Sequence, residues 1–369
     1  MELKSLHLHN FRCYSDLKIT FDKKITVLVG LNGRGKSAIL DGIELALSAL
    51  DGEPLGISSR DVRMEPLREN KKIVGMEQRL PVEIEADLGK LKLYRRLEER
   101  HGETFDTVTG KNMETGPAHI FVYYDIGRIE EEAHFFSKSY AEIKDAFPVI
   151  KNAVNRGLHR YNTKFDYNKK LDKFVFIDNV DGELLAEGAS DGARCAMGMV
   201  ADLAWQIAMT NPDLGAKAAE VTPGIVLIDE VDLLLHPSWQ QTVLTDLMRT
   251  FPKIQFVVTT HSPQVLSTVK AKQIRILDDK NNMVVIPNFA LGAESKQLLE
   301  DIQHVSTRPT HIPIVRSLNR YLKLVAEDKF DTPEALVLRK TLDNWCGGND
   351  PVLLRADMDI RLRKMRRQK

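Results

Sequence analysis

Short, continuously apolar runs recur along the chain and predict the strands of a buried sheet. These runs lie at residues 25–29, 120–124, 225–228, 254–259 and 274–277. Strands that are covered on both faces have this composition, because neither face needs polar residues for contact with water. The last run is expected to form a hairpin with residues 283–286, because residues 278–282 between them are rich in turn-forming side chains.

Other segments carry helical or alternating patterns. Apolar residues three or four positions apart form stripes that are typical of amphipathic helices. The stripes are Ile39, Ile43, Leu47 and Leu50; Ala196, Val200, Leu203 and Ile207; and Leu318, Tyr321, Leu322 and Val325. Residues 82–88 and 91–97 instead alternate apolar with polar positions, which predicts a small antiparallel sheet.

Strands that alternate with helices indicate an α/β fold with a mainly parallel sheet. We expect this unit to span residues 1–290. A short helical insertion is expected at about residues 129–173, where the chain is polar and mostly helical in pattern but lacks the sustained heptads of a coiled-coil arm. Residues 291–369 are expected to form a C-terminal helical region that ends in a strongly basic tail.

The composition favours a packed cytoplasmic protein. The chain has 369 residues, 43% of them hydrophobic, and 52 Lys and Arg balance 52 Asp and Glu. A neutral chain has no overall field that attracts nucleic acid or an anionic membrane, so any such affinity must come from a local patch. Cys13, Cys195 and Cys346 lack the spacing of a disulfide framework or a zinc site. Neither a signal peptide nor a membrane-spanning run is visible, so we expect no membrane association.

The strongest chemical signal lies between the first apolar run and the first helical stripe. Residues 30–37 read Gly-Leu-Asn-Gly-Arg-Gly-Lys-Ser and fit the phosphate-loop pattern G-x-x-x-x-G-K-[ST]. In such a loop backbone amides surround the β-phosphate, Lys36 neutralises phosphate oxygens and Ser37 offers a hydroxyl to Mg²⁺. A chance glycine-rich turn would explain the glycines but not the Lys-Ser pair. We expect ATP to contact Asn32, Gly33, Arg34, Gly35, Lys36, Ser37 and Ala38.

Two carboxylates follow the apolar run at residues 225–228. Ligands of open α/β sheets gather at the carboxyl ends of the parallel strands, where Asp229 and Glu230 would lie. Asp229 is a candidate ligand of Mg²⁺, and Glu230 is a candidate to orient and polarise the attacking water. Such a pair alone is more often a solvated loop or a helix cap. Its combination with the phosphate loop favours the catalytic interpretation.

Two further candidate sites, His261 and the segment with Ser190 and Gly192, are supported by their position in the expected fold more than by their residue types. His261 follows the strand at residues 254–259 and could hydrogen-bond the γ-phosphate, although a lone histidine after a strand is usually structural. Ser190 and Gly192 precede a helix and could bind an anion, although a simple N-cap would look the same. Their order between the phosphate loop and the acidic strand favours nucleotide contact for Ser190 and Gly192.

At these four places the sequence resembles the ABC-type ATPases of the SMC, Rad50 and RecF group. Residues 30–37 match Walker A, residues 190–192 the signature motif, residues 225–230 Walker B, and His261 the switch histidine. Residues 6–21, which contain Phe11 and Arg12, also look like the opening strand pair of that group. The resemblance implies an ABC-type ATPase head, a P-loop NTPase with a mainly parallel sheet and an antiparallel β-subdomain.

The same resemblance implies that two heads meet face to face. The signature serine of one subunit, here Ser190, would then contact the γ-phosphate bound to the phosphate loop of the other subunit. The sequence departs from the family at Ala189, where leucine is usual, and at residues 233–237 after Walker B. The glutamine of the Q-loop is not assigned: Gln78 is one candidate, and residues 124–128 resemble the corresponding loop of relatives.

A narrower resemblance concerns the sequences of residues 227–237 and 257–263 and the closing segment 350–369. These are similar to the ATPase subunits of Septu-like antiphage defence systems, including those associated with retrons. The resemblance implies a regulatory or sensor ATPase beside a separate HNH endonuclease, with a retron reverse transcriptase and its RNA-DNA as a further possible partner. An intrinsic nuclease is not expected, because the acidic pair Asp278 and Asp279 lies in the expected hairpin turn.

Two other functions remain open at this point. One is a RecF-like DNA-repair ATPase that clamps duplex DNA, and the other, with little support, is the energising subunit of a transporter. The basic tail could contact phosphate, and it could equally be a solvated or partner-binding helix end. Its candidate residues are Arg361, Arg363, Lys364, Arg366 and Arg367. Whether the dimers build larger oligomers does not follow from the sequence.

Overall fold

The computed structural model of the chain describes residues 2–50, 54–69, 72–100, 103–109, 118–126, 135–136, 138–157, 163–178, 182–277 and 284–367. These residues belong to two compact units, Met1–Gln303 and His304–Lys369. The first unit continues past the expected end at residue 290, because α9 (Ser295–Asp301) buries Leu298 in the core of that unit. The expected turn at residues 278–282 lies outside the described residues.

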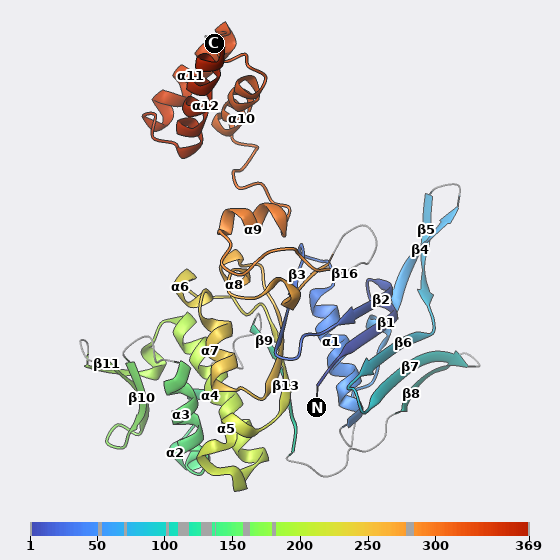
Figure 1. Ribbon diagram of the computed structural model, residues 1–369. Helices are drawn as coiled ribbons and strands as arrows, with labels where there is room; N and C mark the ends of the chain where they lie inside the picture. Colours follow the sequence, from blue (N-terminus) through green and yellow to red (C-terminus); the bar gives the residue numbers. More distant parts are fainter. Residues whose placement is uncertain are drawn as a thin grey trace. The chain divides into compact units, whose positions relative to one another are not determined.

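A six-stranded sheet forms the centre of the first unit (Figure 1). Its strands, in spatial order, are β16 (Val284–Val285), β15 (Ile274–Leu277), β3 (Ile25–Val29), β14 (Ile254–Thr259), β13 (Gly224–Asp229) and β9 (Ile120–Asp125). The five strands from β15 to β9 are parallel, and β16 pairs antiparallel with β15 through Ile276 and Val285. The mainly parallel sheet and the terminal hairpin are therefore confirmed.

Each face of this sheet is covered by a separate hydrophobic core, which explains why its strands are apolar throughout. Ile25, Val27 and Val29 of β3 face one core, and Leu28 faces the other. The first core is closed by α3 (Phe147–Gly157), α4 (Asp191–Thr210) and α7 (Val243–Thr250). On the other face lies α1 (Lys36–Leu47), as Figure 1 shows.

Beyond α1 lies a five-stranded antiparallel sheet, which confirms the alternating segments of the sequence. Its spatial order is β2 (Tyr14–Thr20), β1 (Ser5–Phe11), β6 (Val82–Asp87), β7 (Lys92–Arg100) and β8 (Glu103–Thr109). Arg95 of β7 is fully buried, and its Nη1 donates to the Leu45 carbonyl oxygen at 2.6 Å. A cation at this end of α1 offsets the negative end of the helix dipole.

The helical insertion is only partly helical. The helices α2 (Tyr140–Ile143) and α3 lie in it, but β10 (Thr163–Asn168) is a strand. It forms a three-stranded sheet with β11 (Lys173–Asp178) and β12 (Gly182–Leu185). The expectation of helix up to residue 173 is therefore wrong. The sheet is held by aromatic packing, with the rings of Phe165 and Phe174 stacked at 5.6 Å. With only Phe165 and Tyr167 apolar among its six residues, β10 is too polar for its alternation to stand out in the sequence.

The remaining elements of the first unit are short. A two-stranded hairpin consists of β4 (Arg63–Glu69) and β5 (Lys72–Arg79). Short α-helices are α5 (Ala218–Val221), α6 (Pro237–Gln240) and α8 (Pro263–Leu266). The 3₁₀ helices are η1 (Ser48–Leu50), η2 (Ser59–Asp61), η5 (Ala186–Gly188), η6 (Pro212–Lys217, kinked at Gly215) and η7 (Ala271–Gln273).

Three helices form the second unit: α10 (Pro313–Ala326), α11 (Pro333–Cys346) and α12 (Pro351–Arg367). The predicted stripe is confirmed, since Leu318, Tyr321 and Val325 are buried in the small core and Leu322 packs against it. The basic tail is not a separate extension but the second half of α12. Among the helices of the described residues, none combines the length and the hydrophobicity that crossing a membrane requires.

Candidate nucleotide site

The phosphate loop connects β3 to α1 and is shaped by glycine. Gly35, at the N-terminal cap of α1, has φ 82°, a conformation that L side chains rarely adopt. A Cβ atom there would also collide with Cys13 Sγ and Tyr14 Oη. The Tyr14 hydroxyl in turn donates to the Arg34 carbonyl oxygen at 3.0 Å. Glycine is thus required at position 35 for two independent reasons, while Asn32, Gly33 and Arg34 are exposed.

Lys36 lies inside this loop and only 7% of it is exposed. Its ammonium donates to the carbonyl oxygens of Gly30 (3.0 Å) and Leu31 (3.3 Å). Burial lowers the pKa of Lys36, and the nearby carboxylates that follow β13 oppose this shift. The amine therefore lies between the loop carbonyls and an acidic cluster, where it can contact an added phosphate.

A chain of hydrogen bonds joins α1, β13 and β14. The Ser37 hydroxyl donates to Asp229 Oδ2 at 2.6 Å, and the Thr259 hydroxyl donates to Asp229 Oδ1. The backbone N–H of Glu230 donates to Thr259 Oγ1 at 2.7 Å. Glu230 has φ 55°, which is uncommon for a residue with a Cβ atom. The site thus holds Glu230 in a strained conformation next to the buried Asp229.

His261 lies at the end of β14 with its backbone fixed on both sides. Its N–H donates to Asp232 Oδ1 at 3.3 Å, and Gln303 Nε2 donates to its carbonyl oxygen at 2.8 Å. Its Nε2 atom is buried and, within the described residues, has no hydrogen-bond partner. Burial, followed by the charge of Lys36, lowers the pKa of His261. The imidazole is therefore neutral at neutral pH, close enough to Lys36 to feel its charge.

Ser190 is the N-cap of α4, and Gly192 lies in the first turn of this helix. Ser190 is exposed and caps the helix, accepting from the Ala193 N–H at 3.4 Å. Gly192 packs against the backbone that follows β13, because a Cβ there would collide with the Leu234 carbonyl oxygen. Gly192 is thus required for close packing, and the exposed Ser190 is left free to face another molecule.

Two residues of this network were not singled out in the sequence. Thr259 bridges Asp229 to Glu230, and Asp232 accepts from the Thr260 hydroxyl at 2.5 Å and from the His261 amide. The available signal is a cluster of hydroxyl residues at the end of a fully buried strand. Such polar groups need partners inside the protein, and acidic residues are the nearest acceptors.

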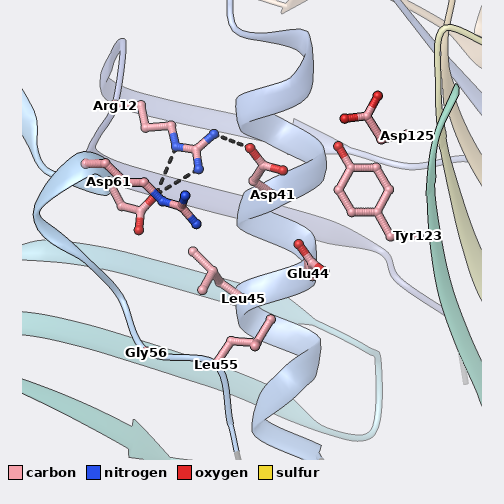
Figure 2. Close-up of a pocket in the computed structure, with 10 residues that line it drawn as sticks. Arg12, Asp41, Glu44, Leu45, Leu55, Gly56, Asp61, Tyr123 and Asp125 are labelled. Atoms are coloured by element: carbon pink, nitrogen blue, oxygen red, sulfur yellow. Dashed lines mark hydrogen bonds and ion pairs between the residues drawn. The ribbon is translucent and has the colours of Figure 1, made fainter. Parts of the chain in front are cut away.

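Beside α1 lies a pocket of about 700 Å³, which Figure 2 shows. Arg12 lines this pocket and donates from Nη2 to Asp61 Oδ1 at 2.8 Å and from Nη1 to Asp41. Burial raises the pKa of Asp41 although Arg12 opposes the shift. Tyr123 and Asp125 lie on the other side of α1 in Figure 2.

The charge of this pocket argues against a phosphate there. Its lining contains four carboxylates and two guanidinium groups, one of which, that of Arg12, already bonds two of the carboxylates. A triphosphate would be repelled by the excess negative charge, so it fits the amides of the phosphate loop better. Of the Q-loop candidates, Gln78 lies in the β4–β5 hairpin, and residues 127–128 lie outside the described part of the chain.

Comparison with known proteins supports this reading of the geometry. A family model described as an AAA domain matches residues 5–185. A second, described as "AAA domain, putative AbiEii toxin, Type IV TA system", matches residues 201–267. Among solved structures, the SMC head domain from Thermotoga maritima shares 17% identity at a TM-score of 0.51, covering 78% of this chain and 98% of that chain. This likeness shows the fold of the head.

Relatives share the sequence as well. The chain is 36% identical to the Retron Ec83 probable ATPase of Escherichia coli over 52% of this chain and 35% of that protein. It is 22% identical to the Retron Vc95 probable ATPase of Vibrio cholerae serotype O1 biovar El Tor over 92% and 87%. It is 26% identical to the Septu protein PtuA of Bacillus mycoides (strain KBAB4) over 74% and 40%.

In fold the chain is similar to an SMC head domain, and in sequence it is similar to retron ATPases and a Septu protein. It spans only about a third of the first of these relatives and less than half of the third. The first family model includes the phosphate loop.

The side chains of this site fit a nucleotide with Mg²⁺. A serine hydroxyl and a carboxylate converge at Ser37 and Asp229, and both are oxygen donors of the kind that Mg²⁺ prefers. No three His, Cys, Asp or Glu side chains converge as a metal site in the described residues. Mg²⁺ needs no such cage, because it retains waters and shares its ligands with substrate phosphates.

Replacing Gly192 by alanine should destabilise the protein by about 1–3 kcal/mol, because the added methyl group overpacks against the Leu234 carbonyl. Chemical denaturation measures the loss. Gly188→Ala is the matched control, since its nearest neighbour, Leu184 Cδ1, lies at an ordinary 3.8 Å. Equal stability of the two variants would contradict the close approach of α4 to the segment after β13.

Thr259→Val should leave one Asp229 oxygen and the Glu230 N–H without their partner while preserving shape. We expect a loss of about 1–3 kcal/mol in the free energy of unfolding, because both groups are shielded from water. Thr259→Ser keeps the hydroxyl and should retain most of the stability. A valine variant as stable as the serine variant in urea unfolding would show that the bridge contributes nothing.

Proposed function

We propose that this chain binds and hydrolyses ATP as the regulatory or sensor subunit of an antiphage defence complex, where it controls a partner HNH endonuclease through ATP-dependent head-to-head dimerisation. The observation that carries the proposal is the convergence of Ser37 and Asp229 at 2.6 Å, between the phosphate loop and the end of β13. The names of the retron and Septu relatives support the biological setting.

Binding of the triphosphate rests on the start of α1. The amides of residues 32–38 and the positive end of the helix surround the phosphates. Lys36 exchanges its bonds to the Gly30 and Leu31 carbonyls for bonds to phosphate oxygens. Ser37 and Asp229 hold Mg²⁺, which when bound supplies positive charge to the phosphate oxygens.

Hydrolysis rests on Glu230 and His261. The Thr259 hydroxyl fixes the backbone of Glu230, so its carboxylate can orient and polarise a water for attack on the γ-phosphate. His261 Nε2, buried and open for a hydrogen bond, is available to the γ-phosphate. The lowered pKa of His261 keeps this ring neutral at neutral pH, so one tautomer donates from Nε2 without adding charge.

The second half of the site comes from a second copy of the chain. Ser190 is exposed at the start of a 20-residue helix, whose N-terminus favours an anion. In the dimer it contacts the γ-phosphate bound to the partner's phosphate loop. Separation of the two copies after hydrolysis is the change that a bound endonuclease would sense. A retron reverse transcriptase with its RNA-DNA, or DNA, is a further partner of such a complex.

A RecF-like DNA-repair ATPase is the alternative function. The observation in its favour is the basic second half of α12, which could contact phosphates. The two functions differ in their dependence on a nuclease. Protection of cells from phage that requires a co-expressed HNH endonuclease supports the defence function, whereas ATP-dependent clamping of duplex DNA by this chain alone supports the alternative.

Two substitutions separate binding from hydrolysis. Lys36→Ala should abolish ATP binding, because it removes the cation among the phosphates. Glu230→Gln should bind ATP normally and hydrolyse it about a hundredfold or more slowly, since a general base contributes about 10²–10⁴. Nucleotide binding is measured by fluorescence titration and turnover by phosphate release. Normal turnover of Glu230→Gln would remove Glu230 from the mechanism.

Mixing experiments test the shared site. Ser190→Arg blocks the face that α4 presents to a partner but leaves the phosphate loop intact, and Lys36→Ala does the reverse. A mixture of the two variants should recover partial ATPase activity, because one of the two composite sites in a mixed dimer is then complete. Each variant alone serves as the control. Complete inactivity at every mixing ratio would contradict a site shared between copies.

A further inference from the structure

Helix α12 has two apolar faces, and only one of them is covered. Leu353 and Ala356 are buried in the small core of the second unit. On another face, four large apolar residues are exposed: Leu354 by 47%, Met358 by 65%, Leu362 by 55% and Met365 by 66%. We refer to these four residues as the α12 stripe. An exposed apolar row of this kind marks an interaction surface.

The α12 stripe has the geometry of a helix-packing seam. Its members are spaced by four, four and three positions, so they lie within an arc of about 80° on the helix surface. They extend over about 17 Å, or three turns. On a heptad the four residues fall at the d, a, e and a positions, which form the apolar stripe with which an amphipathic helix packs against a partner. A partner helix of about three turns would therefore cover the stripe.

The opposite face is anchored, so the exposure of the stripe follows from how α12 packs. Asp357 accepts from Arg339 Nη2 of α11 at 2.9 Å. Arg363 Nη1 donates to the carbonyl oxygen of Ala326, at the end of α10, at 3.2 Å. Lys364 lies over the ring of Phe330 at 5.6 Å. Rotating the helix to bury the stripe would break all three contacts.

The charge around the stripe selects its partner. Residues 304–369 contain 14 Lys and Arg against 8 Asp and Glu, a net charge of +6, while residues 1–303 contain 38 against 44, a net charge of −6. Arg355 and Arg361 are exposed next to the stripe on its two sides. A second α12 would bring like charges together, which opposes self-association through this face. An amphipathic helix with acidic flanks matches both the apolar row and the charge.

Nucleic acid fits the stripe less well. Phosphates would satisfy the arginines, but four aliphatic and thioether side chains at helical spacing would stay exposed to water. Proteins bind single strands by stacking bases on aromatic rings, and the stripe contains no such ring. The observations therefore favour a protein helix.

We propose that the α12 stripe is the docking surface for an acidic amphipathic helix of a partner protein. Leu354, Met358, Leu362 and Met365 fill the seam, and the flanking arginines pair with the partner's carboxylates. The chemistry of this helix follows from α12 alone. Only its assignment to the endonuclease rests on the proposed function.

The test uses the full chain and a double substitution, Met358→Glu with Leu362→Glu. Both residues are exposed, so the fold should persist, and circular dichroism checks this. The matched control is Val337→Glu on α11, which is 67% exposed in the same unit but outside the stripe. The first probe is a labelled three-heptad peptide with leucine at a and d and glutamate at e and g, and its lysine counterpart is the charge control.

Fluorescence anisotropy should show that the glutamate peptide binds the unsubstituted chain and Val337→Glu alike. The double variant should bind it at least tenfold more weakly, and the lysine peptide should not bind. Equal affinity for the double variant would overturn the proposal. If the double variant lost duplex-DNA binding but kept peptide binding, the stripe would be a nucleic-acid surface and the proposal would be wrong. If sedimentation showed that the double substitution converts a dimer to a monomer, the stripe would bind a second copy of the chain, which would also overturn the proposal.

The second probe is the co-expressed HNH endonuclease. It should co-purify with Val337→Glu and be lost from the double variant, while ATP turnover stays unchanged in both. Co-purification of the endonuclease with the double variant would overturn its assignment to this surface. Failure of the proposed function would give a different result. Phage protection would then persist in Lys36→Ala, whether or not the glutamate peptide binds the α12 stripe.

Discussion

The site depends on one buried carboxylate that is held from two sides. Asp229 ends the strand β13, and it accepts from Ser37 at the start of α1 and from Thr259 at the end of β14. An ionised group in such a place is tolerated only where hydrogen bonds replace lost water. The three elements are therefore fixed relative to one another before any nucleotide arrives. This preorganisation is what catalysis by positioning requires.

How far the sequence predicts this arrangement depends on whether the relevant interactions are local. The strands β3, β14 and β15 were predicted at their observed bounds, because burial on both faces leaves a continuous apolar run. The phosphate loop was recognisable because its glycines, lysine and serine lie within eight residues. By contrast, β10 was missed, because its strand conformation is stabilised by packing of its aromatic residues on β11, which is a contact between separate segments.

Interactions between distant residues also limit what the sequence predicts about the site and about the surface of the second unit. Thr259 and Asp229 are thirty positions apart, so their hydrogen bond is invisible without the sheet that brings them together. The α12 stripe was hidden for another reason. Apolar residues occur on two faces of this helix, and a periodicity analysis does not say which face the core uses. Only the packing of α12 separates the covered face from the open one.

The contact between Gly192 and Leu234 has a mechanical consequence. Leu234 follows Glu230 by four residues, and Gly192 follows Ser190 by two, so each lies close in sequence to a candidate residue of the nucleotide site. With no Cβ between them, the two backbones touch without slack. Any shift of the loop behind Glu230 is therefore transmitted directly to the tip of α4. The first turn of α4, which carries the exposed Ser190, is thereby coupled mechanically to the segment that carries Glu230.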